Sequence, residues 1–302
     1  MSVSPRPLFS VPLPGGRVLE LGQRTLVMGI LNVTPDSFAD DGLRMDPDRA
    51  VADALRMIED GVDILDIGGE STRPGAPAVP ADEEWRRVAP VLERLRGVGI
   101  PVSIDTYKAE VAEKAIAAGA TVVNDVSGLT FDPALAAVVG RSGAAVVLMH
   151  HRGRSDAMYA RAQYVDVVAD VIHELAARGV VAREAGIEAD RIIFDPGIGF
   201  AKRAAQSMAV LAQLDAFATL GRPILSGPSR KSFMKSALGD VPPNERVWGT
   251  AAAVTASILA GAHIVRVHDV REMVQVVRVA DAIRSSMPAQ APRPETGPKS
   301  PV

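Results

Sequence analysis

One short unit recurs along the chain and limits the folds that the chain can adopt. In this unit a glycine ends an alanine-rich helical stretch, a run of β-branched residues follows, and a polar residue comes directly after the run. Glycine tolerates the left-handed conformation that closes a helix, and a short β-branched run is typical of a strand buried on both faces. The copies are Gly61–Asp66, Gly119–Asn124, Gly143–His150 and Gly261–His268.

Four further apolar runs also stop at a polar residue. They are Leu26–Leu31 before Asn32, Pro101–Ile104 before Asp105, Arg191–Phe194 before Asp195, and Pro223–Leu225 before Ser226. Between the runs, Asp46-Pro47 and Asp132-Pro133 each offer a helix cap followed by proline. Eight βα units in one chain of 302 residues predict a single (β/α)₈ TIM barrel; a doubly wound open sheet is the competing architecture. In both folds the polar strand ends line the site.

The two ends of the chain differ from the repeated part. Residues 1–24 contain several prolines and no apolar stretch of signal-peptide length, so we interpret them as a short N-terminal extension. Residues 25–286 are expected to form the barrel, and the proline-rich residues 287–302 predict a disordered tail. No uncharged apolar run has the length of a membrane span, so no contact with a membrane is expected.

Charge and cysteine content exclude several classes of function. The net charge is −3 and the basic residues are scattered, so the chain lacks the basic face that a nucleic-acid partner requires. The chain contains no cysteine, which excludes a disulfide framework, a thiolate zinc site and a cysteine nucleophile. This composition is compatible with a cytoplasmic location.

The polar strand ends belong to longer motifs, which are Gly29–Phe38, Gly69–Gly75, Ser103–Thr106, Asn124–Gly128, Asp195–Phe200, Ser229–Phe233 and Arg266–Asp269. A buried carboxylate such as Asp105 or Asp195 is costly unless a donor pairs with it. Either residue can accept two parallel N–H bonds from a ligand, or it can serve a structural ion pair or a helix cap. Arg266 and His268 lie two residues apart and point the same way on a strand. They form a cationic pair at the barrel mouth, or salt bridges to Asp269 or Glu272.

Together and in this order, the motifs resemble those of the bacterial dihydropteroate synthases, a family of pterin-binding enzymes, over about residues 20–285. The resemblance implies a transferase of folate biosynthesis. Such an enzyme condenses (7,8-dihydropterin-6-yl)methyl diphosphate with 4-aminobenzoate to give 7,8-dihydropteroate and diphosphate. It also implies a Mg²⁺ cofactor, a target of the sulfonamide drug class, and a homodimer packed through barrel helices; the helix Thr250–Ala260 is a candidate for that contact, or it serves ordinary barrel packing.

The resemblance assigns pterin-binding roles to individual residues. Asp195 matches the carboxylate that binds the pterin amino group and ring N–H, and Asp105 and Asn124 match residues on the opposite ring edge. Lys231 matches the lysine that reaches the pterin carbonyl and ring nitrogen. Met149 matches the apolar residue that packs against the ring.

The same resemblance assigns the diphosphate and 4-aminobenzoate sites. Asn32 matches the residue that contacts the diphosphate and Mg²⁺, and Arg266 and His268 match diphosphate ligands. Together with Lys231, these are the predicted catalytic residues. The 4-aminobenzoate pocket is implied for the following positions: Phe38, Thr72, Arg73, Pro74, Phe200 and Ser232. Asp36 is a further candidate for holding the metal or orienting the amine.

Some positions depart from the usual family pattern. Asp41 and Ala201 stand where the family usually has glycine, and Gln206-Ser207 replaces a common His-Asn pair. His151 follows His150 where methionine is common; adjacent strand residues point to opposite faces, so the two histidines are not expected to share a metal. None of these positions matches a pterin or diphosphate ligand.

Two other functions remain open on the sequence. A methyltetrahydrofolate:corrinoid methyltransferase shares the barrel and the residues on the pterin edge, but it has no use for a diphosphate site or for the loops Thr34–Gly42 and Ser71–Ala78. A catalytically silent paralogue that binds pterin is the other alternative. Release of diphosphate separates both from the synthase.

Overall fold

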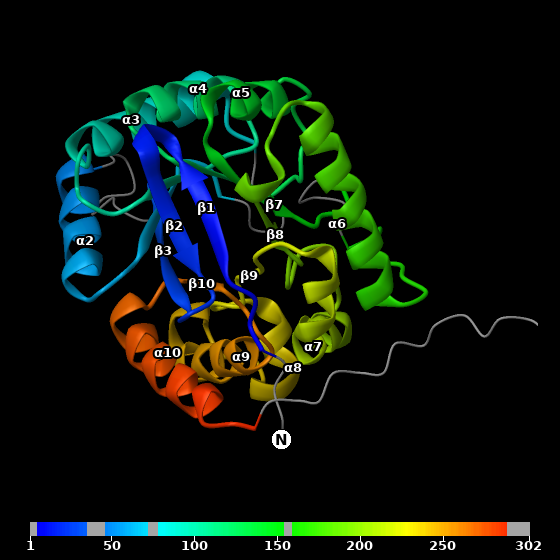
Figure 1. Cartoon of the computed structure of the whole chain (residues 1–302). Helices are drawn as coiled ribbons and strands as arrows, with labels where there is room; N and C mark the ends of the chain where they lie inside the picture. Colours follow the sequence, from blue (N-terminus) through cyan, green and yellow to red (C-terminus); the bar gives the residue numbers. More distant parts are fainter. Residues whose placement is uncertain (1–4, 35–45, 72–77, 154–158, 289–302) are drawn as a thin grey trace, which may run out of the picture.

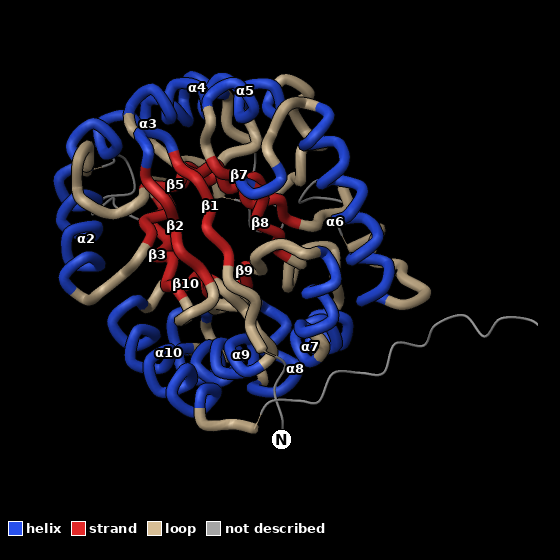
Figure 2. The backbone as a smooth tube through the Cα atoms, viewed as in Figure 1, coloured by secondary structure: helices blue, strands red, loops and turns tan. Residues whose placement is uncertain are grey.

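The computed structural model describes residues 5–34, 46–71, 78–153 and 159–288. Eight parallel strands lie at its centre and helices surround them (Figure 1, Figure 2). The strand order is β8-β7-β6-β5-β4-β3-β10-β9, and the cylinder closes where Phe194 of β8 pairs with Ile224 beside β9. The predicted (β/α)₈ barrel is therefore confirmed.

Each predicted strand overlaps an observed one. The barrel strands are β3 (Leu26–Asn32), β4 (Ile64–Gly68), β5 (Val102–Asp105), β6 (Val122–Asp125), β7 (Ala145–Met149), β8 (Ile192–Asp195), β9 (Leu225–Ser226) and β10 (Ile264–Val267). Almost every position in them is buried on both faces, which explains why the sequence shows continuous apolar runs rather than alternation.

The α-helices pack around this cylinder. They are α2 (Pro47–Glu59), α3 (Ala81–Arg94), α4 (Ala109–Ala118), α5 (Leu135–Ser142), α6 (Val167–Glu184), α7 (Ala204–Ala212), α8 (Lys235–Leu238), α9 (Val247–Leu259) and α10 (Val270–Ser285). Short 3₁₀ turns lie between successive elements: η1 (Pro14–Gly16), η2 (Ala189–Arg191), η3 (Leu214–Leu220), η4 (Ser232–Met234) and η5 (Pro243–Glu245). None of the helices in the described ranges is long and apolar enough to cross a membrane.

One of the two expected helix caps is confirmed and the other is wrong. Asp46 caps α2, because its Oδ1 accepts the backbone N–H groups of Asp48 and Arg49 at 2.9 and 3.3 Å. Asp132 does not occupy the cap position of α5, which begins two residues later than expected. Its carboxylate instead joins two helices: it accepts the N–H of Ala134 before α5 and that of Ala109 in the first turn of α4.

The N-terminal extension contains a structured hairpin that the sequence analysis did not predict. Strands β1 (Phe9–Leu13) and β2 (Arg17–Leu21) pair antiparallel and lie across the front of the barrel in Figure 1. Every second side chain is buried, and these side chains join one apolar cluster with residues near the beginning of the barrel strands, such as Met28 and Ile264. The hairpin therefore covers the end of the barrel opposite the polar strand ends. The predicted disordered tail lies outside the described residues from position 289 onward.

Candidate active site

The carboxyl ends of the strands bring together polar side chains that are far apart in the sequence. Arg266 of β10 lies at the centre of this group. Its Nε donates to Asp66 Oδ2 and its Nη2 donates to Asp105 Oδ2, each at 2.6 Å. Asn124 Nδ2 donates to the same Asp66 oxygen at 3.0 Å. Two carboxylates, an arginine and an amide from four strands thus form one hydrogen-bonded cluster, and Arg266 is the partner that the buried acids require.

Asp66 is a member of this cluster that the sequence analysis did not assign to the site. It ends a β-branched run, as Asn124 does, and it is fully buried. The signal in the sequence is its place directly after an apolar run, which predicts a position near the site but no individual role. Asp66 fixes the arginine from one side while Asp105 fixes it from the other.

Burial controls the ionisation of Asp105. It raises the pKa of Asp105 to about 7, while Arg266 lowers this pKa and Asp66 raises it further. The Oδ1 atoms of Asp66 and Asp105 are both buried without a hydrogen-bond partner among the described residues. Such an acceptor favours a ligand that brings an N–H donor.

Asp195 and Lys231 form the other side of the site. Asp195 Oδ1 accepts the N–H of Gly197 at 2.7 Å, and burial raises the pKa of Asp195 while Lys231 opposes that shift. A Cβ at Gly227 would lie 3.8 Å from Asp195 Oδ2, 3.8 Å from Lys231 Nζ and 3.8 Å from Arg266 Cβ. The three charged side chains therefore border the space beside Gly227, which lacks a side chain of its own.

Lys231 connects this region to Phe200. Its Nζ donates to the carbonyl oxygen of Ile198 and lies 4.3 Å from the centroid of the Phe200 ring. Burial lowers the pKa of Lys231 to about 8, and Asp195 raises it. Ser232 follows at the start of η4 and is exposed, whereas Met149 is buried at the end of β7.

Arg266 and His268 do not form the open cationic pair that the sequence suggested. Arg266 is bound to two carboxylates, whereas His268 Nδ1 lies 3.0 Å from Ser229 Oγ. The alternative, a salt bridge from Arg266 or His268 to Asp269, is not seen among the described residues either. Asp269 pairs with Arg230, whose Nε donates to Asp269 Oδ2 at 3.0 Å. The ion pair with Asp269 ties the loop of Arg230 to the start of α10, and the φ of Arg230, 58°, places it in the left-handed region.

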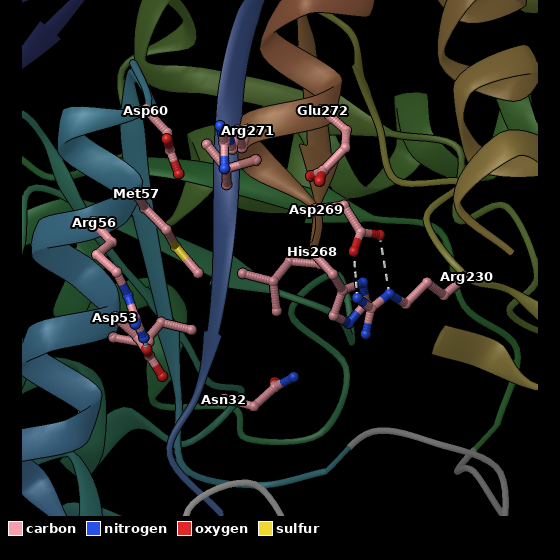
Figure 3. A pocket seen from close by; sticks show the side chains of 13 residues that line it. Asn32, Asp53, Arg56, Met57, Asp60, Arg230, His268, Asp269, Arg271 and Glu272 are labelled. Carbon is pink, nitrogen blue, oxygen red and sulfur yellow. Dashed lines mark hydrogen bonds and ion pairs between the residues drawn. The ribbon is translucent and has the colours of Figure 1, made fainter. Parts of the chain in front are cut away.

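Asn32 and His268 share a cavity of about 420 Å³. Figure 3 shows their side chains around it, together with the Arg230–Asp269 pair. The rest of the wall comes from β3, from α2 and its C-cap, and from the first turn of α10: Ile30, Leu31, Asp53, Arg56, Met57, Asp60, Val270, Arg271 and Glu272. Arginines and carboxylates both line the cavity, and the N-terminus of α10 is the part of its wall that suits an anion. Among the described residues Asn32 is the predicted metal ligand, and no group of three or more His, Cys, Asp or Glu able to hold a metal occurs in those ranges.

The neighbouring histidines follow the end of β7 and have different surroundings. His150 contacts Glu174 and Lys202, whereas the His151 ring lies 5.7 Å from Phe131 and 5.8 Å from Phe200. Burial lowers the pKa of each histidine to about 4. The two rings therefore do not converge on one point.

The structure also bears on the departures from the family pattern. Ala201 has a φ of 47°, which is the conformation that glycine adopts most easily. Gln206 closes the first turn of α7, because its side chain accepts the N–H of Arg203 at 2.8 Å, and Ser207 is fully buried. Several predicted positions lie outside the described residues: Asp36, Phe38, Asp41, Thr72, Arg73 and Pro74.

Comparisons with known proteins agree with the motifs. A sequence profile described as "Pterin binding enzyme" matches residues 28–268. The dihydropteroate synthase of Synechocystis is 48% identical over 91% of this chain and 96% of its own length. That of Bacillus subtilis is 46% identical over 88% of this chain and 90% of its own length.

Solved structures show the same relationship. The dihydropteroate synthase of Xanthomonas albilineans with 4-aminobenzoic acid superposes with a TM-score of 0.84 at 44% identity, covering 92% of this chain and all of the other. The Burkholderia cenocepacia enzyme complexed with 7,8-dihydropteroate superposes with a TM-score of 0.82 at 41% identity, covering 92% of this chain and 98% of the other. These likenesses span nearly the whole of each protein, so the chain belongs to the dihydropteroate synthase family of pterin-binding enzymes.

Proposed function

We propose that this protein condenses (7,8-dihydropterin-6-yl)methyl diphosphate with 4-aminobenzoate and releases diphosphate. The observation that carries this proposal is the convergence of Asp105, Asn124, Asp195, Lys231 and Arg266 on one barrel mouth. A flat heterocycle with donors and acceptors on both edges matches this set of acids, amide and cations. Relatives whose structures contain 4-aminobenzoic acid or 7,8-dihydropteroate support the same substrates.

Within this proposal, Asp195 accepts hydrogen bonds from the pterin 2-amino group and from the ring N–H. Its Oδ1 already accepts the N–H of Gly197, and a carboxylate oxygen has a second lone pair for the ligand. Asp105 and Asn124 bind the opposite ring edge, where the unpartnered Oδ1 of Asp105 is a ready acceptor. Lys231 donates to the pterin carbonyl and ring nitrogen, and Met149 packs against the ring.

We assign the diphosphate to the side of the cavity where Asn32, His268 and the N-terminus of α10 lie; Arg266 precedes His268 by two residues in the chain. Among the described residues the protein supplies one metal ligand here, the amide oxygen of Asn32. A single protein oxygen fits Mg²⁺, because this ion usually keeps several waters and takes substrate oxygens as ligands. When bound beside Asn32, Mg²⁺ would neutralise charge on the diphosphate. His268 and the helix N-terminus stabilise the negative charge of the leaving group by hydrogen bonds and by the helix dipole.

The chemistry needs no nucleophile from the protein. The bond between the exocyclic methylene carbon and the diphosphate oxygen breaks, and diphosphate keeps the electron pair. The aniline nitrogen of 4-aminobenzoate forms the new C–N bond and then loses one proton. The protein's contribution is to orient the two substrates and to stabilise the departing charge. Phe200 and Ser232, with Phe38, Thr72, Arg73 and Pro74, are proposed to hold the 4-aminobenzoate.

We also propose a homodimer in the cytoplasm. The predicted helix α9 packs on the barrel through one face, which includes the buried residues Thr250 and Val254, but it leaves Trp248 81% exposed. Leu238 of α8 is 44% exposed, and the two residues flank Gly249, whose Cβ would lie 2.9 Å from Leu238 Cδ1. An exposed tryptophan on α9 and an exposed leucine on α8, which packs close to α9 at Gly249, support a partner on this surface. Sedimentation of the wild type and of Trp248→Ala tests the assembly.

The function is tested by incubating the purified protein with the pterin diphosphate, 4-aminobenzoate and Mg²⁺. We expect release of diphosphate that depends on both substrates, together with formation of 7,8-dihydropteroate. Pterin binding without any release would identify a silent paralogue. Methyl transfer from methyltetrahydrofolate in place of diphosphate release would identify the methyltransferase alternative.

A further inference from the structure

Lys202 is a buried lysine that none of the family matches assigned to the site. It lies after β8, and only 1% of its surface is exposed. Its Nζ lies 2.9 Å from His150 Nδ1, 3.1 Å from the carbonyl oxygen of Gly197 and 3.2 Å from that of Phe200. An ammonium group has three protons to donate. These three acceptors match them, so the charged form of Lys202 is fully hydrogen-bonded.

The first of these contacts sets the tautomer of His150 whenever Lys202 is charged. Because an ammonium donates and cannot accept, His150 Nδ1 is then the acceptor. The ring proton then resides on Nε2, which lies 3.0 Å from Glu174 Oε2. Burial and then Lys202 lower the pKa of His150 to about 4, in accord with a neutral ring. A chain of hydrogen bonds thus runs from Lys202 through His150 to Glu174 at the surface.

The other two contacts hold the segment that frames the proposed pterin and 4-aminobenzoate sites. The N–H of Gly197 donates to Asp195, while its carbonyl accepts from Lys202. Lys231 holds the same segment from the site side, through the carbonyl of Ile198. Gly197 has a φ of 68°, and a Cβ there would lie 2.1 Å from the carbonyl oxygen of His150. Residues 196–200 are therefore fixed tightly between two lysines.

Charge links Lys202 to Asp195 as well. Burial raises the pKa of Asp195, and Lys231 and Lys202 both lower it. In return, Asp195 raises the pKa of Lys202, which burial lowers to about 7. Each group therefore stabilises the charged form of the other. The proposed pterin contact needs this state, because an ionised carboxylate accepts two N–H bonds whereas a protonated one must donate at one oxygen.

We infer that Lys202 is a positioning residue for the condensation: it holds residues 197–200 in place, and with them the Gly197 N–H that Asp195 accepts, with His150 and Glu174 supporting it from behind. Lys202 touches neither substrate in this inference. It acts through Asp195 and through the backbone that carries Phe200. The inference rests on the function proposed above, so wild-type activity must be established first.

Lys202→Met tests the inference, since methionine fills a similar volume and removes both the charge and the donors. Lys235→Met is the matched control, because Lys235 is an exposed lysine whose partner is the exposed Asp240. We expect kcat/KM for the pterin diphosphate to fall about 10²-fold in Lys202→Met, the effect of a small misplacement of binding groups. Lys235→Met should match the wild type.

The pH profile separates positioning from simple structural damage. Without Lys202 the pKa of Asp195 rises, so the acidic limb of kcat/KM for the pterin should move to higher pH. The charged or titratable groups that act on Lys202 are Asp195, Lys231, Glu174, Arg152, His150 and His151. A variant that merely loses folded protein would lower activity by the same factor at every pH and leave the limb in place.

Glu174→Gln keeps the test decisive if Lys202→Met fails to fold. Glu174 raises the pKa of Lys202 and is partly exposed, so neutralising it is mild. Lys202 should then lose its proton at a lower pH. The basic limb of the kcat/KM profile, where activity falls as Lys202 loses its proton, should move down by roughly half a pH unit, the effect of a partly screened charge. Glu184→Gln, on an exposed position of the same helix, should not move the limb.

The outcomes are distinct. A wild type that releases no diphosphate overturns the proposed function. An active wild type, with a folded Lys202→Met of unchanged kcat/KM and unchanged acidic limb, overturns the role of Lys202. If Lys202→Met does not fold, an unshifted basic limb in Glu174→Gln overturns it instead.

Discussion

At the mouth of the barrel, Arg266 Nη2 lies 2.6 Å from Asp105 Oδ2. Asp105 is buried, and burial raises its pKa to about 7 even though Arg266 opposes the shift. A carboxyl group with this pKa changes its charge within the pH range in which such a protein is handled. The pair therefore links the proposed pterin site to the stability of the fold.

Replacing Asp105 with asparagine should flatten the dependence of stability on pH. The pKa of Asp105 is higher in the folded than in the unfolded chain, where it is about 3.9. The folded state therefore binds the proton more tightly than the unfolded state. Protonation of Asp105 stabilises the folded protein fully at a pH below the unfolded pKa, and this stabilisation is lost as the pH rises to about 7. The loss is at most about 4 kcal/mol. Urea unfolding at several pH values measures it.

Asp105→Asn cannot titrate and should lack this decline between about pH 4 and 7. Asp82→Asn, at an exposed position on α3, should keep the wild-type slope. Equal slopes in the wild type and in Asp105→Asn would show that Asp105 is not the titrating group.

Lys231→Ala should weaken pterin binding by about 10- to 100-fold, the loss of one charge-assisted hydrogen bond. Lys231 is the lysine proposed to contact the pterin ring, and its Nζ borders the space beside Gly227. Calorimetric titration with a pterin that lacks the diphosphate measures the effect. Lys235→Ala, four residues further along and exposed, provides the control. Unaltered pterin affinity in Lys231→Ala would exclude Lys231 from the pterin site.

Ala201→Gly should stabilise the protein by up to about 1 kcal/mol. Ala201 has a φ of 47°, and a side chain in the left-handed region costs about 1–2 kcal/mol, part of which the flexibility of glycine in the unfolded chain offsets. Thermal unfolding checks the sign. Ala209→Gly inside α7 should have the opposite effect, a loss of about 1 kcal/mol. Destabilisation by both substitutions would mean that position 201 is not strained.

Leu21→Ala should lower the free energy of unfolding by about 2–5 kcal/mol, as expected when a large buried side chain is truncated. Leu21 lies in the hairpin that covers the amino end of the barrel and is 2% exposed. Val18→Ala on the same strand removes a side chain that is 51% exposed, so its effect should stay below about 0.5 kcal/mol. Chemical denaturation compares the two, and similar losses would argue against a buried hairpin face.

The sequence predicted the parts of the fold that follow from local pattern. Gly61, Gly119, Gly143 and Gly261 all have positive φ values and precede buried strands, as expected. The hairpin was missed because the prolines in residues 1–24 suggested irregular chain. Yet Pro12 is compatible with a two-stranded sheet, which leaves some backbone N–H groups unpaired. The alternation of buried and exposed residues in β1 and β2 was the signal that remained.

The site was only partly predictable for a different reason. Strand-end residues such as Asp195 stand out because an acid after an apolar run is unusual. Their partners do not stand out: the pairing of Arg266 with Asp66 joins residues 200 positions apart. Lys202 looks like a surface lysine in the sequence, and only the three-dimensional fold buries it. Local pattern therefore indicated where the site lies, and the fold decided which charges neutralise one another.

The most direct test of the central claim compares diphosphate release by the wild type and by Asp195→Asn, which preserves shape and removes the charge. With both substrates and Mg²⁺ present, kcat/KM for the pterin diphosphate should fall by at least about 10²-fold, since two charge-assisted hydrogen bonds are weakened, while thermal unfolding shows a folded protein. Wild-type activity in Asp195→Asn would contradict a pterin site built around this carboxylate.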